Sequence, residues 1–463
     1  MTGHASVDSS TQGRAPGAEV GPAELNMTLS DALERAQADL REGRFDAAES
    51  IFVQILDQMP DEPNALHFFG LLRHQQGRTA EAIPYLRRTT QLVPEAPGPW
   101  MNLGNVLIET EQFIEALIPL QRAQRLDPES PTNYNNLGIA YLHADQLEAS
   151  EAAFREGLRL DPKRHELHHN FARMLKAGGR LPEAVASLNR SIELQPDIAA
   201  SHQLLSICHF ELGDTALSLA ALQKWQTLDP ENPKIDHLRA GILGKETPLR
   251  ASDDYVRDEF DKFAESFDHK LDLLEYRAPA LVTQALTAIV SALPDAPAIL
   301  DAGCGTGLCA PLIKPFCGRL VGVDLSQGML QQAEKRRLYD CLERAELTEY
   351  LEKSPATFDA VISADTLCYF GDLAGFLIAA HRSLRGFGVV IFTLESLVDR
   401  SADFHLQIHG RYSHSREYVL RVVRENGFSV AGLTCKTLRK ETDKDVAGFL
   451  VTAVRIPGAE SSN

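Results

Sequence analysis

Ile299-Leu-Asp-Ala-Gly-Cys-Gly-Thr-Gly307 has the pattern of a buried strand that ends in an acid, followed by a G-x-G-x-G turn and a helix that starts near Leu308. The glycines let the backbone turn tightly and approach a ligand closely. Dehydrogenases favour G-x-G-x-x-G, which places a pyrophosphate at the helix N-terminus. Here the third glycine comes one residue early. The stretch therefore predicts a ligand-binding turn with a spacing that differs from the dinucleotide pattern.

Short β-rich runs alternate with amphipathic stretches around this turn. The runs are AIL, RLVGVD, FDAVISA, VVIFTL, SVAGLTC and GFLVTAV. This alternation predicts a parallel or mostly parallel α/β sheet, with an antiparallel hairpin formed by the last two runs at one edge. The second run ends in Asp324, 17 residues after Gly307. A carboxylate at that strand end suits a ribose diol, because it accepts hydrogen bonds from both hydroxyls.

The first half of the chain has a period of 34 residues. Six prolines fall on it, namely Pro60, Pro94, Pro128, Pro162, Pro196 and Pro230. One small slot, where the two helices of a repeat should touch, holds Gly70, Gly104 and Gly138. A second slot, where a left-handed residue should end the first helix, holds Gly43, Gly77, Gly179 and Gly213. The pattern resembles tetratricopeptide repeats over about 29–232, a helical solenoid.

Asp301, the glycine turn, Asp324 and the segment Phe358–Asp365 together resemble class I S-adenosylmethionine-dependent methyltransferases. Another Rossmann-like nucleotide binder is the alternative. The resemblance implies that Gly303 and Gly305 lie against the methionine part of the cofactor and that Asp324 holds the ribose. Asp301 would orient the loop or the ammonium group.

The same resemblance assigns further residues to the cofactor. The complete set implied to bind S-adenosyl-L-methionine is Asp301, Gly303, Gly305, Gly307, Asp324, Leu325, Met329 and Glu346. Leu325 and Met329 would pack near the adenine, and Glu346 would accept from its amino group. For Glu346 the alternative is a solvated charge at a strand end.

Further segments extend the resemblance. Residues 259–269, EFDKFAESFDH, match a pattern found in one methyltransferase group, in which a helix covers the cofactor with aromatic side chains as a lid. Phe260, Phe263 and Phe267 stand at helical spacing, so a core-facing stripe is the alternative. The segments 363–373, 410–419 and 438–451 resemble bacterial tetratricopeptide-repeat methyltransferases. One departure is Arg385-Gly-Phe-Gly, where many relatives have Pro-Gly-Gly.

Methyl transfer is an in-line displacement, so the main task of the protein is to position two reactants. A neutral nucleophile also needs a base. We expect catalytic candidates past the carboxyl ends of the strands. They are Asp365, Tyr369 and His414, with Glu395 as a further candidate after the fifth strand. Asp365 alternatively caps a helical turn. His414, with His405 and His409, lacks a cysteine or carboxylate that would complete a metal site, so we expect no metal.

A row of asparagines follows the repeat period. Asn102, Asn136 and Asn170 occupy one slot of successive repeats. An amide donates to a backbone carbonyl and accepts from an N–H group, so such a row can hold an extended peptide in the concave groove whatever its sequence. The alternative is that asparagine fills this slot and bridges neighbouring helices.

Composition limits the partners. The charge sum is 46 minus 64, or −18, and no long Lys/Arg run is present, so we expect no nucleic-acid partner. No apolar stretch approaches the roughly 20 residues of a membrane span. The N-terminus lacks a secretory pattern. The seven cysteines are irregularly spaced, which is typical of a reducing compartment. These features favour a cytoplasmic protein.

The sequence predicts five regions. They are a disordered tail (1–28), six tetratricopeptide repeats (29–232), a capping helix and linker (233–252), a class I methyltransferase domain (253–457) and a flexible end (458–463). We interpret the chain as a methyltransferase whose repeats recruit a protein substrate or partner. A quinone- or lipid-like small acceptor, with the repeats used for assembly, is one alternative. A non-catalytic scaffold is another, and the oligomeric state stays open.

Overall fold

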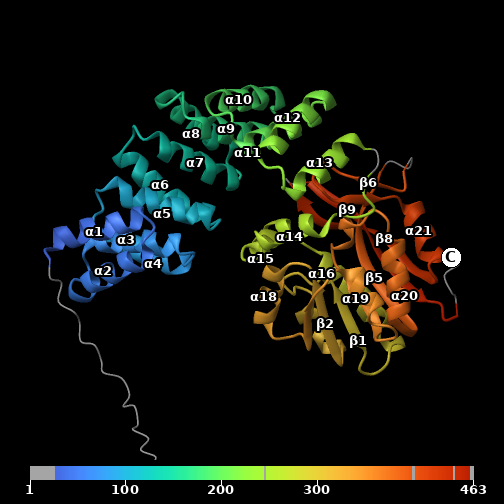
Figure 1. The fold of residues 1–463 in the computed structure, drawn as a ribbon. Helices are drawn as coiled ribbons and strands as arrows, with labels where there is room; N and C mark the ends of the chain where they lie inside the picture. Colours follow the sequence, from blue (N-terminus) through green and yellow to red (C-terminus); the bar gives the residue numbers. More distant parts are fainter. Residues whose placement is uncertain (1–26, 245–246, 399–401, 442–443, 459–463) are drawn as a thin grey trace, which may run out of the picture. The chain divides into compact units, whose positions relative to one another are not determined.

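The computed structural model describes residues 27–244, 247–398, 402–441 and 444–458 (Figure 1). It divides into two compact units, one up to Met174 and one from Leu175. Most of the tail predicted for 1–28 and of the flexible end predicted for 458–463 lies outside the described residues. No helix within the described ranges has the length and apolar composition needed to cross a bilayer.

Antiparallel helix pairs form the repeats, as the 34-residue period predicts. The repeat helices are α1 (Leu29–Arg41), α2 (Phe45–Gln58), α3 (Pro63–Gln75), α4 (Thr79–Leu92), α5 (Pro97–Glu109), α6 (Phe113–Leu126), α7 (Pro131–His143), α8 (Leu147–Leu160), α9 (His165–Ala177), α10 (Leu181–Leu194), α11 (Ala199–Glu211), α12 (Thr215–Leu228) and α13 (Pro233–Leu243). The division between the two units falls inside α9.

The small slot of the repeats is where two helices meet. A Cβ atom at Gly138 would lie 2.6 Å from the ring of Phe154, and one at Gly70 would lie 2.9 Å from Cγ of Leu86. The turn slot is confirmed as well: its four glycines have φ between 72° and 86°. Glu111 and Asp145 hold φ of 60° and 57° on the same spacing. The left-handed turn therefore belongs to every repeat, with or without glycine.

A nine-stranded sheet forms the core of the α/β part. Its strands are β1 (Ala298–Ala302), β2 (Arg319–Asp324), β3 (Cys341–Arg344), β4 (Phe358–Ser363), β5 (Leu384–Ser396), β6 (Phe404–Leu406), β7 (Tyr412–His414), β8 (Phe428–Glu441) and β9 (Lys444–Arg455). The order β3-β2-β1-β4-β5 is parallel throughout. The predicted hairpin is confirmed, because β9 runs antiparallel to both β5 and β8.

Strands β6 and β7 have no counterpart among the predicted runs. The last two residues of β5 also pair with β7, in parallel. The sheet thus forks at the carboxyl end of β5, between β7 and β9. The helix that follows β7, α21 (Arg416–Glu425), begins directly after its N-cap Ser415.

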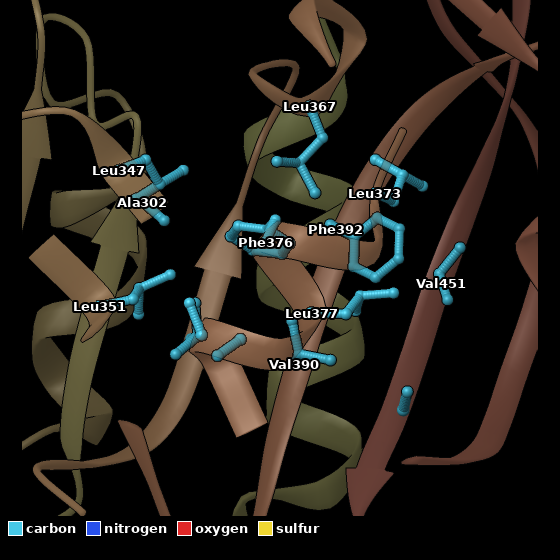
Figure 2. Packing of buried hydrophobic residues seen from close by; sticks show 14 of the residues in the cluster. Ala302, Leu347, Leu351, Leu367, Leu373, Phe376, Leu377, Val390, Phe392 and Val451 are labelled. Atoms are coloured by element: carbon cyan, nitrogen blue, oxygen red, sulfur yellow. The ribbon is translucent and has the colours of Figure 1, made fainter. Parts of the chain in front are cut away.

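Helices cover both faces of the sheet. The helices of the α/β part are α14 (Asp253–Asp261), α15 (Phe267–Leu273), α16 (Ala278–Ile289), α17 (Ala310–Ile313), α18 (Gln327–Arg336), α19 (Leu347–Glu352), α20 (Ala374–Ser383) and α21 (Arg416–Glu425). Side chains of α19, α20 and α21 pack on one face, where Phe376 and Leu377 meet Phe392 of β5 (Figure 2). The other face is covered by α16 and α17. This three-layer packing buries the sheet and leaves its carboxyl edge for a site.

The segment that precedes α14 is tied to the α/β part. The carbonyl of Leu249 accepts hydrogen bonds from the N–H groups of Gly371 and Asp372, each at 2.8 Å. The N–H of Ala251 donates to the carbonyl of Tyr369, and the hydroxyl of Tyr412 donates to the carbonyl of Pro248. Residues 247–251 are thus docked rather than free, and the boundary expected at 252 stays a prediction.

Replacing Gly138 with alanine tests the close helix contact within a repeat. The added Cβ would press on Phe154, and overpacking of this kind costs about 1–3 kcal/mol. Gly98→Ala in α5 is the matched control, because nothing lies within 4 Å of a Cβ there. Thermal unfolding followed by circular dichroism should show a lower Tm for Gly138→Ala alone. Equal melting of the two variants would contradict the assigned contact.

Candidate functional site

A pocket opens at the carboxyl ends of β1, β2 and β4, where ligands bind in sheets of this kind. We call it the central pocket. Its empty volume is about 1160 Å³, open solvent at the mouth included. The glycine turn after β1 lines one side, and Phe260 and Phe267 from α14 and α15 line another. Arg250, Arg411 and Arg439 also face it.

Backbone geometry explains the glycines of the turn. Gly303, Gly305 and Gly307 have φ of 74°, 53° and 85°, a region that favours glycine. A Cβ at Gly303 would collide with the side chain of Thr366. Gly303 and Gly305 line the central pocket, and their contact with a cofactor stays a prediction. Gly307 does not line it and lies against Tyr339 and Arg336 instead.

Asp324 joins the glycine turn to the end of β2. One carboxylate oxygen accepts from the N–H of Gly305 at 2.9 Å, and the other accepts from the N–H of Ser326 at 2.9 Å. Burial raises the pKa of this carboxyl group, and these backbone hydrogen bonds oppose the rise. A carboxylate offers about four acceptor positions, so it can accept a further donor beside these backbone groups. Asp324 lines the central pocket and can accept hydroxyl groups there.

Asp301 lies behind the turn rather than in the central pocket. Its Oδ2 accepts from the hydroxyl of Tyr339 at 2.7 Å. Oδ1 is buried and has no hydrogen-bond partner among the described residues. Burial raises the pKa of Asp301 to about 7. The alternative in which Asp301 binds the ammonium group of a cofactor is therefore not supported, since its carboxylate does not reach the pocket lining.

Leu325, Met329 and Glu346 all line the central pocket. Met329 stands in the first turn of α18, whose N-cap is Ser326. Glu346 is 8% exposed, and its carboxylate accepts from the N–H of Glu349 at 2.9 Å, which caps α19. The alternative for Glu346, a solvated charge, is therefore wrong.

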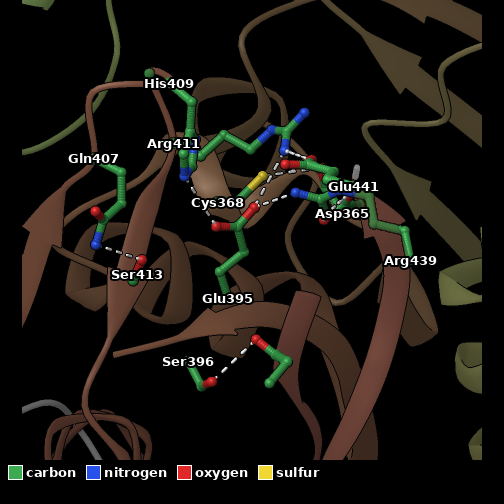
Figure 3. Close-up of polar contacts among 12 residues, drawn as sticks. Asp365, Cys368, Glu395, Ser396, Gln407, His409, Arg411, Ser413, Arg439 and Glu441 are labelled. Atoms are coloured by element: carbon green, nitrogen blue, oxygen red, sulfur yellow. Dashed lines mark hydrogen bonds and ion pairs between the residues drawn. The ribbon is translucent and has the colours of Figure 1, made fainter. Parts of the chain in front are cut away.

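Asp365 belongs to a network of charges (Figure 3), of which Arg439 and Glu395 are buried. Its φ is 58°, an uncommon conformation for a residue with a side chain. Both of its carboxylate oxygens accept from Arg439, at 3.0 and 3.2 Å. Arg439, which is 1% exposed, also pairs with Glu395 and Glu441, and Arg411 pairs with the same two glutamates. The carboxylate of Asp365 faces the pocket already ion-paired.

Tyr369 and His414 have different surroundings. Tyr369 lines the central pocket, its ring meets that of Phe260 at 5.4 Å, and burial raises the pKa of its hydroxyl. His414 is fully buried in β7, does not line the pocket, and donates from Nε2 to the carbonyl of Gly371 at 3.0 Å. Burial lowers the pKa of His414 to about 4. The catalytic assignment of His414 is therefore corrected: it is a neutral core histidine.

The asparagine row joins neighbouring repeats through its amides. Asn102 Nδ2 lies 2.9 Å from Nε2 of His67. Asn136 and Asn170 donate to the amide oxygens of Asn105 and Asn135, at 3.4 and 2.9 Å. Each partner belongs to the preceding repeat, so this geometry matches the bridging alternative. The peptide-holding role stays a prediction.

Several pocket residues were not assigned to the site from the sequence. They are Arg250, Tyr276, Thr306, Thr366, Arg411 and Arg439. Arg411 and Arg439 fall within segments that carry the family resemblance, but no spacing rule marks them individually. Within the described ranges, no group of three or more His, Cys, Asp or Glu side chains is arranged to hold a metal ion.

The raised pKa of Asp301 predicts how stability depends on pH. The unfolded carboxyl group loses its proton near pH 4, whereas the folded one keeps it up to about pH 7. The folded state therefore binds more protons in this window, so its stability should fall as the pH rises. Asp301→Asn should remove this slope and gain on the order of 2–4 kcal/mol over wild type between pH 5 and 7.5.

Urea unfolding at several pH values, without added ligand, checks this expectation. The matched control is Asp295→Asn, which changes an exposed carboxylate in the same domain. Parallel stability curves for Asp301→Asn and wild type would show that Asp301 does not retain its proton.

Comparison with known proteins agrees with this geometry. Residues 300–392 match the family model described as a methyltransferase domain. Residues 33–98, 100–165 and 170–233 match the model for the tetratricopeptide repeat. Together the matched segments cover both the repeats and the strands that carry the glycine turn.

Individual relatives match parts of the chain. Methyltransferase-like protein 27 of Homo sapiens is 40% identical over 110 residues, which is 23% of this chain and 45% of the relative. Malonyl-[acyl-carrier protein] O-methyltransferase of Yersinia pestis is 26% identical over 180 residues, 38% of this chain and 64% of the relative. The chain thus spans about half to two thirds of these relatives.

Among solved structures, that of Pseudomonas aeruginosa PilF is 17% identical, with a TM-score of 0.41. The match covers 46% of this chain and 96% of that protein. The family models and the geometry together establish the architecture: the chain combines a tetratricopeptide-repeat solenoid with a methyltransferase domain.

Proposed function

We propose that this chain is a class I methyltransferase that uses S-adenosyl-L-methionine and that its repeats bind a protein substrate or partner. The observation that carries the proposal is the link between Gly305 and Asp324. It places a bare backbone turn and a half-buried carboxylate side by side in the central pocket. A carboxylate with spare lone pairs fits a ribose diol, and the open turn fits an amino-acid moiety.

The other lining residues fit the same ligand. Leu325 and Met329 provide an apolar surface for a base, and Glu346 provides an acceptor at its edge. Asp301 lies behind the glycine turn, where its hydrogen bond with the hydroxyl of Tyr339 helps to orient Tyr339 and the turn. When bound, the cofactor supplies an electrophilic methyl group on a sulfonium. The task of the chain is then to bring an acceptor to it in line.

The end of the pocket lined by Asp365 and Tyr369 is suited to positioning a methyl acceptor rather than to removing a proton from it. Both carboxylate oxygens of Asp365 accept hydrogen bonds from Arg439, so they are already engaged as acceptors. The hydroxyl of Tyr369 stays neutral, because burial raises its pKa. We therefore propose that Asp365 and Tyr369 orient the acceptor and that the acceptor arrives as a competent nucleophile or loses its proton to water.

A small acidic acceptor is the second candidate. Arg250 and Arg411 line the pocket, and a guanidinium group recognises a carboxylate well. One relative is named for methylation of a malonyl-carrier protein, in which a small acid is joined to a protein. A non-catalytic scaffold is less consistent with the intact turn and Asp324. Seven free cysteines favour a reducing, cytoplasmic location.

Asp324→Asn tests the cofactor assignment. The amide keeps one acceptor oxygen but loses the charge, so affinity for S-adenosylhomocysteine should fall by about 1.5–3 kcal/mol. Calorimetry measures the change, with Glu343→Gln on the exposed edge strand β3 as the control. Unchanged affinity in Asp324→Asn would refute the ribose role, and a wild-type chain that binds nothing would favour the scaffold.

The class of methyl acceptor is tested by asking which fraction of a lysate takes up a radiolabelled methyl group. Wild type and Asp324→Asn are incubated with radiolabelled S-adenosylmethionine and host lysate, and protein is then separated from an organic extract. Label in protein supports a protein acceptor or an acid carried on a protein, whereas label in the extract supports a free small acceptor. Label that persists in Asp324→Asn at the wild-type level would argue against catalysis by this pocket.

A further inference from the structure

Residues 253–273, which contain α14, α15 and the turn between them, form one wall of the central pocket. We call them the strap. The sequence predicts a single covering helix here, but the structure divides it at 262–266. Phe260 and Phe267 face the pocket, and their rings meet edge to face at 6.0 Å. Phe263 lies outside the lining and packs under the Lys270 ammonium group, whose Nζ is 3.9 Å from the ring centre.

A carboxylate at the end of α14 attaches the strap to the start of α18. Asp261 Oδ1 accepts from the hydroxyl of Ser326 at 2.5 Å and from the N–H of Gly328 at 3.0 Å. Ser326 also donates its N–H to Asp324, the residue proposed to hold the ribose. The first attachment point, Ser326, is therefore two residues along the chain from Asp324 and is hydrogen-bonded to it.

A second carboxylate attaches α15 to the glycine turn. Asp268 Oδ1 accepts from the hydroxyl of Thr306 at 2.5 Å, and Oδ2 is paired with Arg336. Arg336 in turn donates from Nε to the carbonyl of Thr306 at 2.6 Å. Thr306 itself lines the central pocket. The second attachment point is thus part of the turn that would carry the cofactor.

Close packing supports the strap between these two points. Ala264, which is 4% exposed, lies over α18. A Cβ added at Gly328 would stand 3.0 Å from that of Ala264 and 3.4 Å from Oδ1 of Asp261. The position of Gly328 therefore allows the strap to approach the first turn of α18.

The outer side of the strap meets the last helix of the repeats. Lys234 of α13 donates to Glu259 of α14 at 2.5 Å. The rings of His237 and Tyr255 lie 4.0 Å apart, and Nε2 of His237 donates to the carbonyl of Gly410 at 2.8 Å. Helix α13 thus supports α14 from the side opposite the attachment points on α18 and the glycine turn.

We propose that Asp261 and Asp268 are positioning residues that hold the strap over the cofactor side of the central pocket and that α13 braces it there. The proposal rests on the proposed function for the identity of the ligand. Cofactor release then requires that the hydrogen bonds of Asp261 to α18 and of Asp268 to the glycine turn break. Neither carboxylate lines the central pocket, so they affect how long the ligand stays bound rather than the methyl transfer itself.

Release of S-adenosylhomocysteine from the full-length protein, measured by stopped-flow displacement, tests the proposal. Both carboxylates are partly exposed, so each contributes modestly, and Asp261→Asn with Asp268→Asn should together speed release by about 10-fold. The Tm and the association rate should change little. Lys234→Met should also speed release, although Lys234 lies in the repeat part of the chain.

The controls change charges on the same helices. Asp254→Asn alters a carboxylate of α14 that is 77% exposed and pairs with Arg257 of the same helix. Arg239→Met alters α13 away from the strap, because Arg239 pairs with Asp236 and Gln226. Both controls should release the ligand at the wild-type rate. Wild-type release from the double variant would overturn the proposal, and wild-type release from Lys234→Met would overturn the bracing by α13.

Hydrogen exchange separates this proposal from the proposed function. In ligand-free protein, the amides of 253–273 should exchange faster in the double variant than in wild type. Unchanged exchange would overturn the attachment whatever the ligand. If wild type binds no S-adenosylhomocysteine but the strap amides respond, the cofactor assignment fails and the attachment of the strap stands.

Discussion

The carboxylate of Asp324 is the group on which the site depends. It accepts from backbone N–H groups on two separate turns, one after β1 and one before α18. Such donors offset the cost of partly removing a carboxylate from water, and the donors are held in place in return. The glycine turn, the first turn of α18 and, through Ser326 and Thr306, the strap all take their positions relative to this carboxylate.

The opposite end of the central pocket is organised by side-chain charges instead. Arg439 and Arg411 hold Asp365, Glu395 and Glu441 where the sheet forks at the end of β5. Removing one partner from such a network leaves a buried charge uncompensated, so its members are fixed as a group. The pocket therefore joins a backbone-lined half, suited to a common ligand, to a half whose specificity comes from side chains.

Features of the fold and site that depend on residue spacing could be predicted from the sequence, whereas those that depend on contacts between distant segments could not. The repeats and the glycine turn follow from spacing, because small or left-handed residues are required at fixed positions. His414 could not be placed, since its burial depends on β6 and β7, two strands of three residues without a periodic pattern. Asp301 could not be placed either, because its partner Tyr339 comes from a distant loop. Arg439 stands out only when β8 pairs with β9.

Helix α13 has a double contact that bears on how such chains evolve. Ile235 and Ile242 complete an apolar cluster with Leu222 and Trp225 of α12, as a capping helix should. Its other side meets Glu259, Tyr255 and Gly410. Recombination that exchanged the repeats for others at a conventional module border would cut through one of these two interfaces. If α12 and α13 are both inherited with the methyltransferase domain, and the number of repeats varies ahead of α12, both interfaces are preserved.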